Sequence, residues 1–374
     1  MIVQQYRFLS DSWDQELDTS LDSQNTLVVI FASSDLSFLL PPFKRLRQVF
    51  PHSKFIGCST AGEIYEDTLS DERFVVQVMK FEKSRLSLVS EEINASKDSY
   101  EVGRSLAHKL GSPKGVMVFT DGLNVNGTQF TKGLSAVFKD KVPVVGGLAG
   151  DDVKFETTWV IANDTIASNL TVAIGLYGDN LYFGYGSSGG WQSLGVKRKV
   201  TLAKENVVYE LDNQPALALY KHYLGSLAND LPASGLLFPL GIYGEDEIKV
   251  RTILSVDEEE QSIIFAGDIP DGSRVTLMKS SFYNLVQGAI DASNRIAFEK
   301  KECSVYSNIV ISCVGRKLVL KQRVDDEIEA ILSSYEKKNV RQIGFYSYGE
   351  ISPVPSGECD LYNQTMTVIS LGEY

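Results

Sequence analysis

Short apolar runs alternate with helical patterns through the first half of the chain. Runs rich in Val, Ile and Phe, bounded by Gly, Ser or Asp, predict strands at residues 26–33, 73–81, 115–121, 142–147 and 170–178. Between some of them, apolar residues recur at spacings of three and four, which predicts helices containing Leu39, Phe43, Leu46 and Phe50, and Phe130, Leu134, Val137 and Phe138. This alternation indicates an α/β arrangement with a mixed sheet.

The pattern changes after about residue 205. A helical face with Leu217, Tyr220, Leu224 and Leu227 precedes a predicted strand pair, 248–256 and 261–269, joined by the acidic turn DEEE. Two further helical patterns, after residue 281 and around residue 330, flank a buried strand at 308–316, and two strands close the sequence. This half is typical of an α+β fold with packed helices on a largely antiparallel sheet. We therefore expect two domains, residues 1–205 and 206–374.

The composition fits a soluble protein of two domains and excludes some partners. The chain has 374 residues and a formal net charge of −12, which opposes binding to nucleic-acid phosphates. The N-terminus lacks the pattern of a signal peptide, and no stretch approaches the roughly 18 apolar residues of a membrane span. The four cysteines form no CxxC pair, so we expect no zinc site or disulfide framework, and a cytoplasmic location.

Three short segments repeat one pattern, in which a β-type stretch leads through glycine to a Gly-acid pair. They are FIGCSTAGEI (55–64), VVGGLAGDDV (144–153) and IGFYSYGEIS (343–352). The repetition suggests a recurring supersecondary unit. We expect the three loops to gather at one edge of the fold.

The glycine-rich loop VPVVGGLAGDD (142–152) is not a nucleotide-binding loop. A phosphate loop of the Walker type needs a lysine where this chain has Asp151, and a Rossmann fingerprint must open a helix where this chain continues as a strand. One interpretation is a turn whose carboxylates cap backbone N–H groups. The other is a rim where Asp151 and Asp152 receive an ammonium group; a metal is less favoured because the ligand spacing of a calcium loop is missing.

Candidate catalytic groups are few. His52, His108 and His222 lie in no catalytic motif, and we interpret them as structural. Cys58 follows a predicted strand, as a nucleophile can, but a small buried thiol is the usual occupant of such a position. We expect no enzyme activity; a hydrolase using Cys58 or paired carboxylates is the alternative, and the sequence names no base for it.

Arg316 and Trp191 each allow two interpretations. Arg316 ends a predicted strand and could present its planar guanidinium to a ligand carboxylate, or form a surface ion pair. Trp191 could stack on a ligand or fill a seam between the domains.

Eight motifs in order resemble the FIST domains. FIGCSTAGEI, TDGL (120–123), VVGGLAGDD and GGWQSLG (189–195), followed by KVTLA, resemble the FIST N-terminal domain. Four later motifs resemble the FIST C-terminal domain: IPDGSRVTLM (269–278), IVISCVGR (309–316), GFYSYGEISP (344–353) and LYNQTMTVISL (361–371). The resemblance covers nearly the whole chain, from about residue 27 to residue 371.

This resemblance implies a sensory module of signal transduction that binds small ligands such as amino acids. Related chains are often fused to histidine kinase, cyclase or chemoreceptor modules, whereas this sequence ends within the second domain. We therefore expect this protein to signal through a separate partner, such as a histidine kinase or a cyclase. The alternative is a haem-dependent nitric-oxide sensor that regulates such a partner. Many relatives carry a histidine before the Gly-Trp pair, where this chain has Gly189, and this difference counts against haem. We therefore expect no cofactor.

The resemblance gives the loop residues a use as a ligand site. Arg316 could hold a ligand carboxylate and Asp151 or Glu350 an ammonium group, while backbone N–H groups at Gly62 or Gly147 approach the ligand closely. We expect no catalytic residue and no metal ligand. The predicted ligand-binding residues are Ser59, Thr60, Gly62, Glu63, Asp121, Gly147, Asp151, Asp152, Trp191, Arg316, Glu350 and Asn363.

Overall fold

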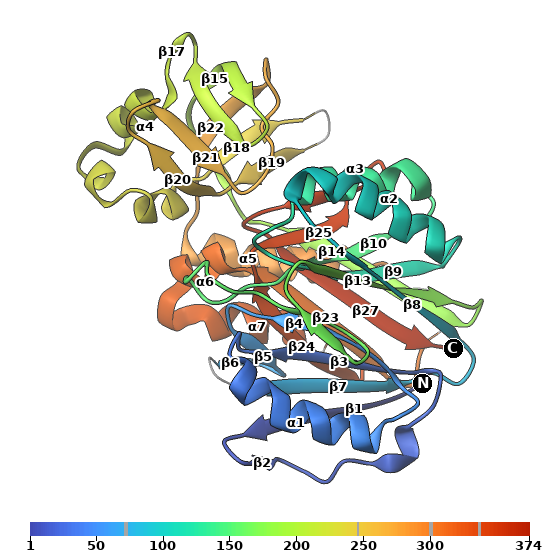
Figure 1. The fold of residues 1–374 in the computed structure, drawn as a ribbon. Helices are drawn as coiled ribbons and strands as arrows, with labels where there is room; N and C mark the ends of the chain where they lie inside the picture. The colour runs from blue at the N-terminus through green and yellow to red at the C-terminus, as the bar shows by residue number, and fades with distance from the viewer. Residues whose placement is uncertain (71–73, 245–246, 299–301, 336–337) are drawn as a thin grey trace.

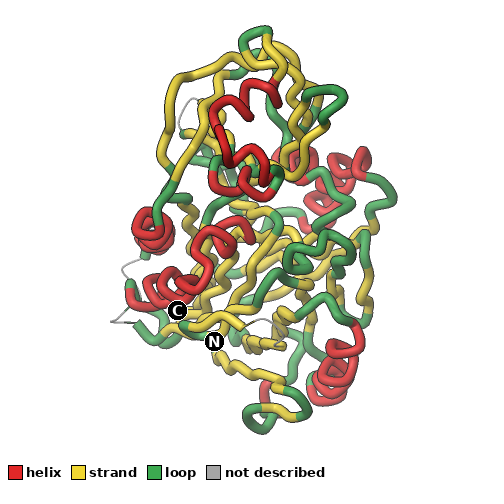
Figure 2. Tube along the Cα trace, turned by 90° about the vertical axis from the view of Figure 1, so that its left-hand side faces the viewer, coloured by secondary structure: helices red, strands yellow, loops and turns green. Residues whose placement is uncertain are grey.

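Three mixed β-sheets surround one apolar core, and a smaller antiparallel module projects from one end of them (Figures 1 and 2). The computed structural model describes residues 1–70, 74–244, 247–298, 302–335 and 338–374. We call the three sheets and their helices the body. Residues 192–279 form the module, which is inserted between a strand and a helix of the body.

Each sheet of the body contains one parallel pair among antiparallel neighbours. The first sheet has the order β12 (Thr165–Ala167), β11 (Val160–Ala162), β4 (Lys54–Ser59), β3 (Thr26–Ala32), β7 (Phe74–Lys80), β1 (Ile2–Leu9) and β2 (Ser12–Trp13). The second has β26 (Cys359–Tyr362), β25 (Gly349–Pro353), β10 (Val144–Leu148), β9 (Gly115–Thr120), β13 (Leu170–Tyr177) and β8 (Arg85–Glu92). The third has β14 (Leu181–Ser188), β27 (Met366–Glu373), β23 (Tyr306–Cys313), β24 (Val340–Ser347), β5 (Glu63–Tyr65) and β6 (Thr68–Ser70). The parallel pairs are β3–β4, β9–β10 and β23–β24.

Helices cover the outer faces of the three sheets (Figure 1). They are α1 (Leu36–Val49) on the first sheet, α2 (Ser99–Leu110) and α3 (Gly127–Phe138) on the second, and α5 (Phe282–Asn294), α6 (Val314–Leu320) and α7 (Val324–Ser333) on the third. Short 3₁₀ turns are η1 (Thr19–Leu21), η2 (Ser96–Asp98) and η5 (Lys321–Arg323). The predicted helices around Leu39 and Phe130 are confirmed as α1 and α3, since their apolar faces are buried.

The inner faces of the sheets meet at a triad of phenylalanines, one from each sheet. The Phe31 and Phe345 rings are stacked with centroids 4.6 Å apart, and Phe119 meets both rings edge-on, at 5.4 and 5.7 Å. All three side chains are fully buried. Contacts of this geometry add about 0.5–1.5 kcal/mol each beyond the burial of apolar area.

The strand that follows each parallel pair crosses into the next sheet. After β4 in the first sheet, β5 pairs with β24 of the third sheet. After β24, β25 pairs with β10 of the second sheet, and after β10, β11 pairs with β4 of the first sheet. The three crossings form a closed cycle, so no sheet can assemble completely without the other two.

The three Gly-acid segments are the turns at which the chain makes these crossings. Each turn donates a backbone N–H to a carbonyl of another turn, which confirms that the loops gather at one place. The bonds run from Gly150 to Ser59 (2.9 Å), from Ala61 to Tyr346 (2.8 Å) and from Tyr348 to Leu148 (3.2 Å). We call this arrangement the turn ring.

The module is a curled antiparallel sheet with one helix. Its strands are β15 (Gln192–Lys204), β16 (Val207–Leu211), β17 (Gln214–Pro215), β18 (Leu240–Tyr243), β19 (Ile248–Arg251), β20 (Ile253–Asp257), β21 (Ser262–Phe265) and β22 (Arg274–Lys279), with α4 (Ala216–Leu224) and the 3₁₀ turns η3 (Gly225–Asp230) and η4 (Ala233–Leu237). The acidic turn DEEE connects β20 and β21, as predicted. The expected boundary after residue 205 falls in the turn between the paired strands β15 and β16.

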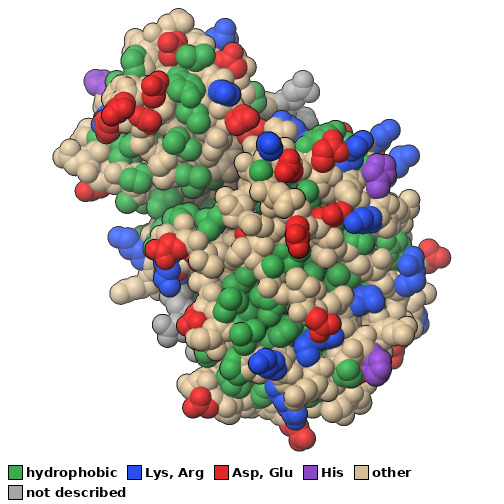
Figure 3. All heavy atoms as spheres, viewed as in Figure 1, with side chains coloured by type: hydrophobic (Ala, Val, Ile, Leu, Met, Phe, Trp, Pro, Cys, Tyr) green, Lys and Arg blue, Asp and Glu red, His purple; other side chains and the backbone are tan. Residues whose placement is uncertain are grey.

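The α/β class with mixed and antiparallel sheets is confirmed, and the predicted strands of the first half correspond to β3, β7, β9, β10 and β13. Residue 73, the first of one predicted strand, lies outside the described residues. Within the described part of the chain, no helix is both long and apolar enough to cross a membrane. Basic and acidic side chains are interspersed over the face drawn in Figure 3.

Filling the space inside the turn ring should destabilise the body. A Cβ on Gly150 would lie 2.9 Å from the backbone nitrogen of Ala61, so Gly150→Ala should lower the free energy of unfolding by about 1–3 kcal/mol, measured by urea denaturation. Gly111→Ala is the control, because a Cβ there meets nothing within 4 Å and only its positive φ adds strain, about 1 kcal/mol. A smaller loss in Gly150→Ala than in Gly111→Ala would contradict tight packing in the ring.

Candidate functional site

The acids of the turn ring bind groups of the protein itself. The buried Asp151 carboxylate accepts backbone N–H groups from Phe155 at 2.9 Å and from Glu156 and Thr157 at 2.7 Å, and it also accepts the Tyr348 hydroxyl. Asp151 therefore caps its own loop, as the first interpretation of this segment proposed. It does not present a free carboxylate to a ligand ammonium group.

The exposed neighbour Asp152 faces a cation from the same chain. The Lys317 ammonium lies 3.3 Å from the Asp152 carboxylate and donates to the Ala61 carbonyl at 2.8 Å. Lys317 comes from α6 and so ties two turns of the ring to the third sheet. The cation predicted for this rim is thus supplied within the protein.

The first turn of the ring is closed by its own side chains. The Thr60 hydroxyl donates to the buried Glu63 carboxylate at 2.5 Å and accepts the Gly62 N–H at 3.1 Å. The Ser59 hydroxyl accepts the N–H of Trp159 at 3.0 Å. Gly62 has φ = +135°, a conformation that favours glycine. These four residues shape the crossing from β4 to β5.

Asp121 and Gly147 also have roles within the fold. Asp121 is fully buried and accepts N–H groups from Leu123 and Asn124 at 2.7 Å and from Asn169 at 2.9 Å, which holds the loop after β9. A Cβ on Gly147 would lie 2.9 Å from a methyl carbon of Ile311, so the glycine lets β10 approach β23. Backbone approach to a ligand is not what requires this glycine.

Arg316 is neither a ligand clamp nor a surface ion pair, and both interpretations are corrected. Its side chain and that of Glu327 are 0% exposed and form an ion pair at 2.6 Å. The remaining donors bind the carbonyls of Gly189 at 2.6 Å and Leu285 at 2.7 Å. Because a buried guanidinium is stable only when paired, the fork stays committed to these partners.

Glu350 is a buried carboxylate with neutral hydrogen-bond donors. It accepts the hydroxyls of Ser347 and Thr365, both at 2.7 Å, and the Thr365 N–H at 3.1 Å. Burial raises the pKa of Glu350 to about 7, and the hydrogen bonds and the more distant Arg316 charge oppose this rise only in part. The group therefore changes charge near neutral pH.

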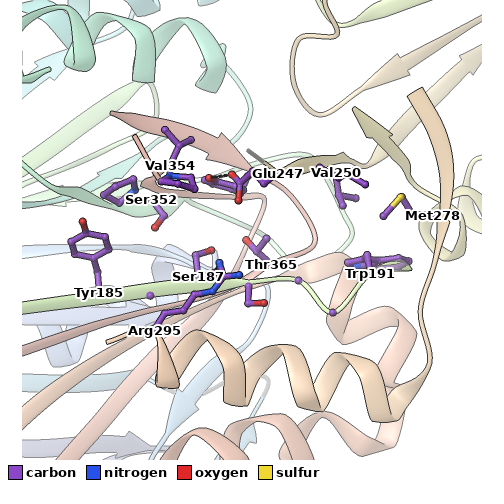
Figure 4. Close-up of a pocket in the computed structure, with 18 of the residues that line it drawn as sticks. Tyr185, Ser187, Trp191, Glu247, Val250, Met278, Arg295, Ser352, Val354 and Thr365 are labelled. Carbon is purple, nitrogen blue, oxygen red and sulfur yellow. Dashed lines mark hydrogen bonds between the residues drawn. The ribbon is translucent and has the colours of Figure 1, made fainter. Parts of the chain in front are cut away.

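A cavity of about 680 Å³ lies where the module meets the body (Figure 4). The body contributes residues of β14, the linker 189–191, Arg295, β25 and the segment before β27; the module contributes residues of β15, β19 and β22 together with Glu247. Figure 4 shows Arg295 and Ser187 on one side, Glu247 and Ser352 on the other, and Trp191 beside Met278 at one end.

The lining of this cavity is rich in hydrogen-bonding groups. Hydroxyls come from Tyr185, Ser187, Ser188, Ser193, Ser352, Tyr362 and Thr365. The Ser352 hydroxyl is buried and has no hydrogen-bond partner among the described residues. Thr365, which also lines the cavity, donates its hydroxyl to Glu350 and so links that carboxylate to the cavity wall.

Two charged groups face this cavity from different units. Arg295 comes from the body, and one nitrogen of its guanidinium donates to the Ser187 carbonyl at 2.6 Å. Glu247 comes from the module and accepts the Tyr362 hydroxyl. The structure records no ion pair for Arg295 among the described residues, so its other donors can serve a bound anion.

The twelve predicted residues thus fall into two groups. Ser59, Thr60, Gly62, Glu63, Asp121, Gly147, Asp151 and Asp152 surround the turn ring, whereas Trp191, Arg316, Glu350 and Asn363 surround the segment 363–365. Trp191 alone of the twelve lines the cavity; its indole N–H donates to the Gln364 carbonyl at 3.0 Å. Asn363 is buried, and its amide atoms have no hydrogen-bond partner among the described residues. Arg295, Glu247, Ser352 and Thr365 were not predicted from the sequence. Ser352 and Thr365 lie within the motifs GFYSYGEISP and LYNQTMTVISL, whereas Arg295 and Glu247 lie in no motif and carried no signal.

The groups considered for catalysis or haem lie elsewhere. Cys58 is fully buried, and this burial raises the pKa of its thiol well above the ordinary value, which disfavours a nucleophilic thiolate. His52, His108 and His222 are exposed and are not among the described residues that line the cavity. Within the described part of the chain, His, Cys, Asp and Glu side chains form no cluster of three suited to a metal ion.

The raised pKa of Glu350 predicts a specific dependence of stability on pH. Because the folded state binds this proton more tightly than the unfolded state, the stabilisation is complete below about pH 4.5 and is lost as pH rises through about 7. Glu350→Gln should remove a loss on the order of 3 kcal/mol between pH 4.5 and 8, measured by urea denaturation at each pH. Glu101→Gln, at an exposed position on α2, is the control and should keep the wild-type loss. Equal losses in Glu350→Gln and the wild type would contradict the assignment.

Comparisons with known proteins agree with the motifs. The chain matches the FIST N domain over residues 26–214 and the FIST C domain over residues 216–353. It is 25% identical to the uncharacterized protein MJ1623 of Methanocaldococcus jannaschii, over 90% of this chain and 71% of that protein.

Likenesses to solved structures are too distant to support an argument. PurLQS from Thermotoga maritima aligns at 9% identity with a TM-score of 0.22, covering 84% of this chain and 74% of that one. T. maritima PurL complexed with ATP aligns at 8% identity with a TM-score of 0.16, covering 78% and 72%. The assignment therefore rests on the two domain matches, which together span most of the chain. The chain belongs to the FIST family, whose N and C domains are sensory domains of signal transduction.

Proposed function

We propose that this protein is a cytoplasmic, non-catalytic sensor that binds an amino-acid-like ligand in the cavity between the module and the body. The observation that carries the proposal is the placement of Arg295 and Glu247 on one cavity, from two different units. A guanidinium binds a ligand carboxylate in a charge-assisted pair, and a carboxylate binds an ammonium group. A zwitterion satisfies both groups at once.

The remaining lining suits the same ligand. A cavity of about 680 Å³ lies within the usual range for small-molecule sites and leaves room for a side chain. Met278 and Trp191 provide an apolar end. Catalysis is not part of the proposal, because no nucleophile paired with a base faces this cavity among the described residues.

The linker between body and module offers a route from ligand to output. The Gly189 carbonyl accepts Arg316, the Gly190 carbonyl accepts the Ser280 hydroxyl at 2.8 Å, and Trp191 is held by Gln364. A ligand that bridges module and body would favour one position of the module and act on this linker. Through Arg316 and its partner Glu327, that preference reaches α6 and α7. The output partner would be a separate protein such as a histidine kinase or a cyclase.

The proposal predicts that each charged wall binds one end of the ligand. Calorimetric titration of the full chain with each of the twenty standard amino acids should identify at least one ligand. Arg295→Gln and Glu247→Gln should each weaken its binding by about 10- to 100-fold, because each removes a charge-assisted contact. The charge-matched control Arg104→Gln, at an exposed position on α2, should bind like the wild type.

Chemical analogues separate the two roles. Converting the ligand's carboxylate to an amide should weaken binding to the wild type but cause little further loss of affinity in Arg295→Gln. Acetylating the ligand's amino group should likewise weaken binding to the wild type but cause little further loss in Glu247→Gln. Binding that both substitutions leave unchanged would place the site elsewhere. Failure of all twenty amino acids to bind would reject the amino-acid class.

A further inference from the structure

Strand β8 forms a long unpaired edge of the second sheet (Figure 1). Its eight residues pair with β13 without a register shift, and no strand of the described residues pairs with its other side. Four other edge strands of the body, β2, β6, β12 and β26, have only two to four residues. Short strands, prolines, lysines and bulges protect an edge from pairing with another chain, and β8 uses none of them.

The other long edge strand of the body is already in use. β14 also has eight residues, but it lines the cavity between body and module, and its Ser187 carbonyl accepts the Arg295 guanidinium. β8 contributes no residue to that cavity among the described residues. β8 is therefore the long edge of the body to which the proposed function gives no role.

Backbone groups on the free side of β8 come from alternate residues. The Ile93 N–H donates at 2.7 Å to the Asn169 carbonyl, which lies directly opposite it in the register of β8 with β13. Along an antiparallel ladder, residues bonded to the neighbour alternate with residues whose N–H and C=O groups point to the other side. The groups of Leu86, Leu88 and Ser90 therefore point away from β13. Within the described part of the chain, these groups have no hydrogen-bond partner.

Two opposite charges lie near the two ends of β8 on one face of the sheet. The Glu91 carboxylate accepts the Ser105 hydroxyl at 2.6 Å and the Lys109 ammonium at 2.5 Å, both from α2. Arg85 lies on the same face, because an even number of residues separates the two. Its guanidinium carbon is 4.2 Å from the centre of the Tyr177 ring, and no ion pair joins it to a described residue. Arg85 is exposed and can bind a further carboxylate.

Two-fold symmetry limits how one β8 edge can pair with another. A two-fold axis normal to the sheet pairs the two edges antiparallel and keeps each side chain on its own face. Because facing residues share a face of the joined sheet, the axis passes through a residue and not between two residues. The registers with the longest overlap within β8 are centred on Leu88 and on Val89.

The charges select the register centred on Leu88. In that register Arg85 of each copy lies directly opposite Glu91 of the other, so both ends of the interface carry facing opposite charges, which stabilise a strand pair. The outward backbone groups of Leu86 then meet those of the partner's Ser90. In the register centred on Val89, Arg85 lies beyond the paired residues and Glu91 has no facing cation.

We propose that this protein forms a symmetric homodimer in which two copies of β8 pair antiparallel about Leu88. The second sheets of the two copies then form one continuous sheet, and the half-buried Leu88 side chains meet at the axis. Each Glu91 binds Arg85 of the partner subunit on one side and Lys109 of its own chain on the other. The dimer leaves the cavity between body and module open, so it is independent of the proposed amino-acid site.

Sedimentation equilibrium of the full chain tests this pairing with charge-reversed variants. The wild type should form dimers whose fraction rises with protein concentration. Arg85→Glu and Glu91→Arg should each weaken dimerisation by about 10-fold or more, because like charges then face each other at both ends. An equimolar mixture of the two variants should dimerise again, because every facing pair in the mixed dimer has opposite charges.

Two further variants separate the edge from general effects of charge. Arg274→Glu makes the same charge change at an exposed position on β22 of the module and should dimerise like the wild type. Ser90→Pro removes an outward N–H and places a ring on the free edge, so it should abolish dimerisation.

Four results would each overturn the proposal. They are a wild type that is monomeric at every concentration, a dimer that survives Ser90→Pro, wild-type dimerisation of Arg85→Glu, and a mixture that dimerises no better than either charge variant alone. The charge variants and their mixture decide the question even where Ser90→Pro fails to fold.

Discussion

The cyclic exchange of strands at the turn ring is the constraint on which the body depends. Each sheet receives a two-stranded hairpin from the chain segment of another sheet, namely β11–β12, β25–β26 or β5–β6. The three crossing turns bind one another through backbone hydrogen bonds. The crossings from β4 to β5 and from β24 to β25 are short, and the longer connection from β10 to β11 passes close to both at Gly150, where a Cβ would meet Ala61. The phenylalanine triad comes from β3, β9 and β24, each a member of one of the three parallel pairs.

This constraint separates structural chemistry from binding chemistry. At the turn ring the carboxylates of Asp151 and Asp152 are satisfied by N–H groups, a hydroxyl and Lys317 from the same chain. At the seam between body and module, by contrast, Arg295 and Glu247 remain available to a guest. The buried pair of Arg316 and Glu327 joins the two regions, because Arg316 donates to the linker carbonyl of Gly189 and Glu327 accepts the hydroxyl of Tyr346 from the turn ring.

Local pattern predicted the class of fold and the convergence of the three Gly-acid turns, since both depend on short-range periodicity and on repetition. It could not assign the partners of Asp151 or Arg316, because those are chosen by long-range packing: Tyr348 is 197 residues from Asp151, and Gly189 is 127 residues from Arg316. The seam cavity draws on segments near residues 187, 247, 295 and 352, which no sequence window brings together. Trp191 was identified from the sequence because it lies in the motif GGWQSLG.

Hydrogen exchange of the full chain with and without an equimolar mixture of the twenty standard amino acids tests the central claim most directly. If a ligand bridges body and module, protection should increase together in the linker 189–191, in β19 and in β25 with the segment 362–365. The turn ring, which is already closed, should exchange slowly in both samples. Protection confined to the turn ring, or to one side of the seam, would contradict the account.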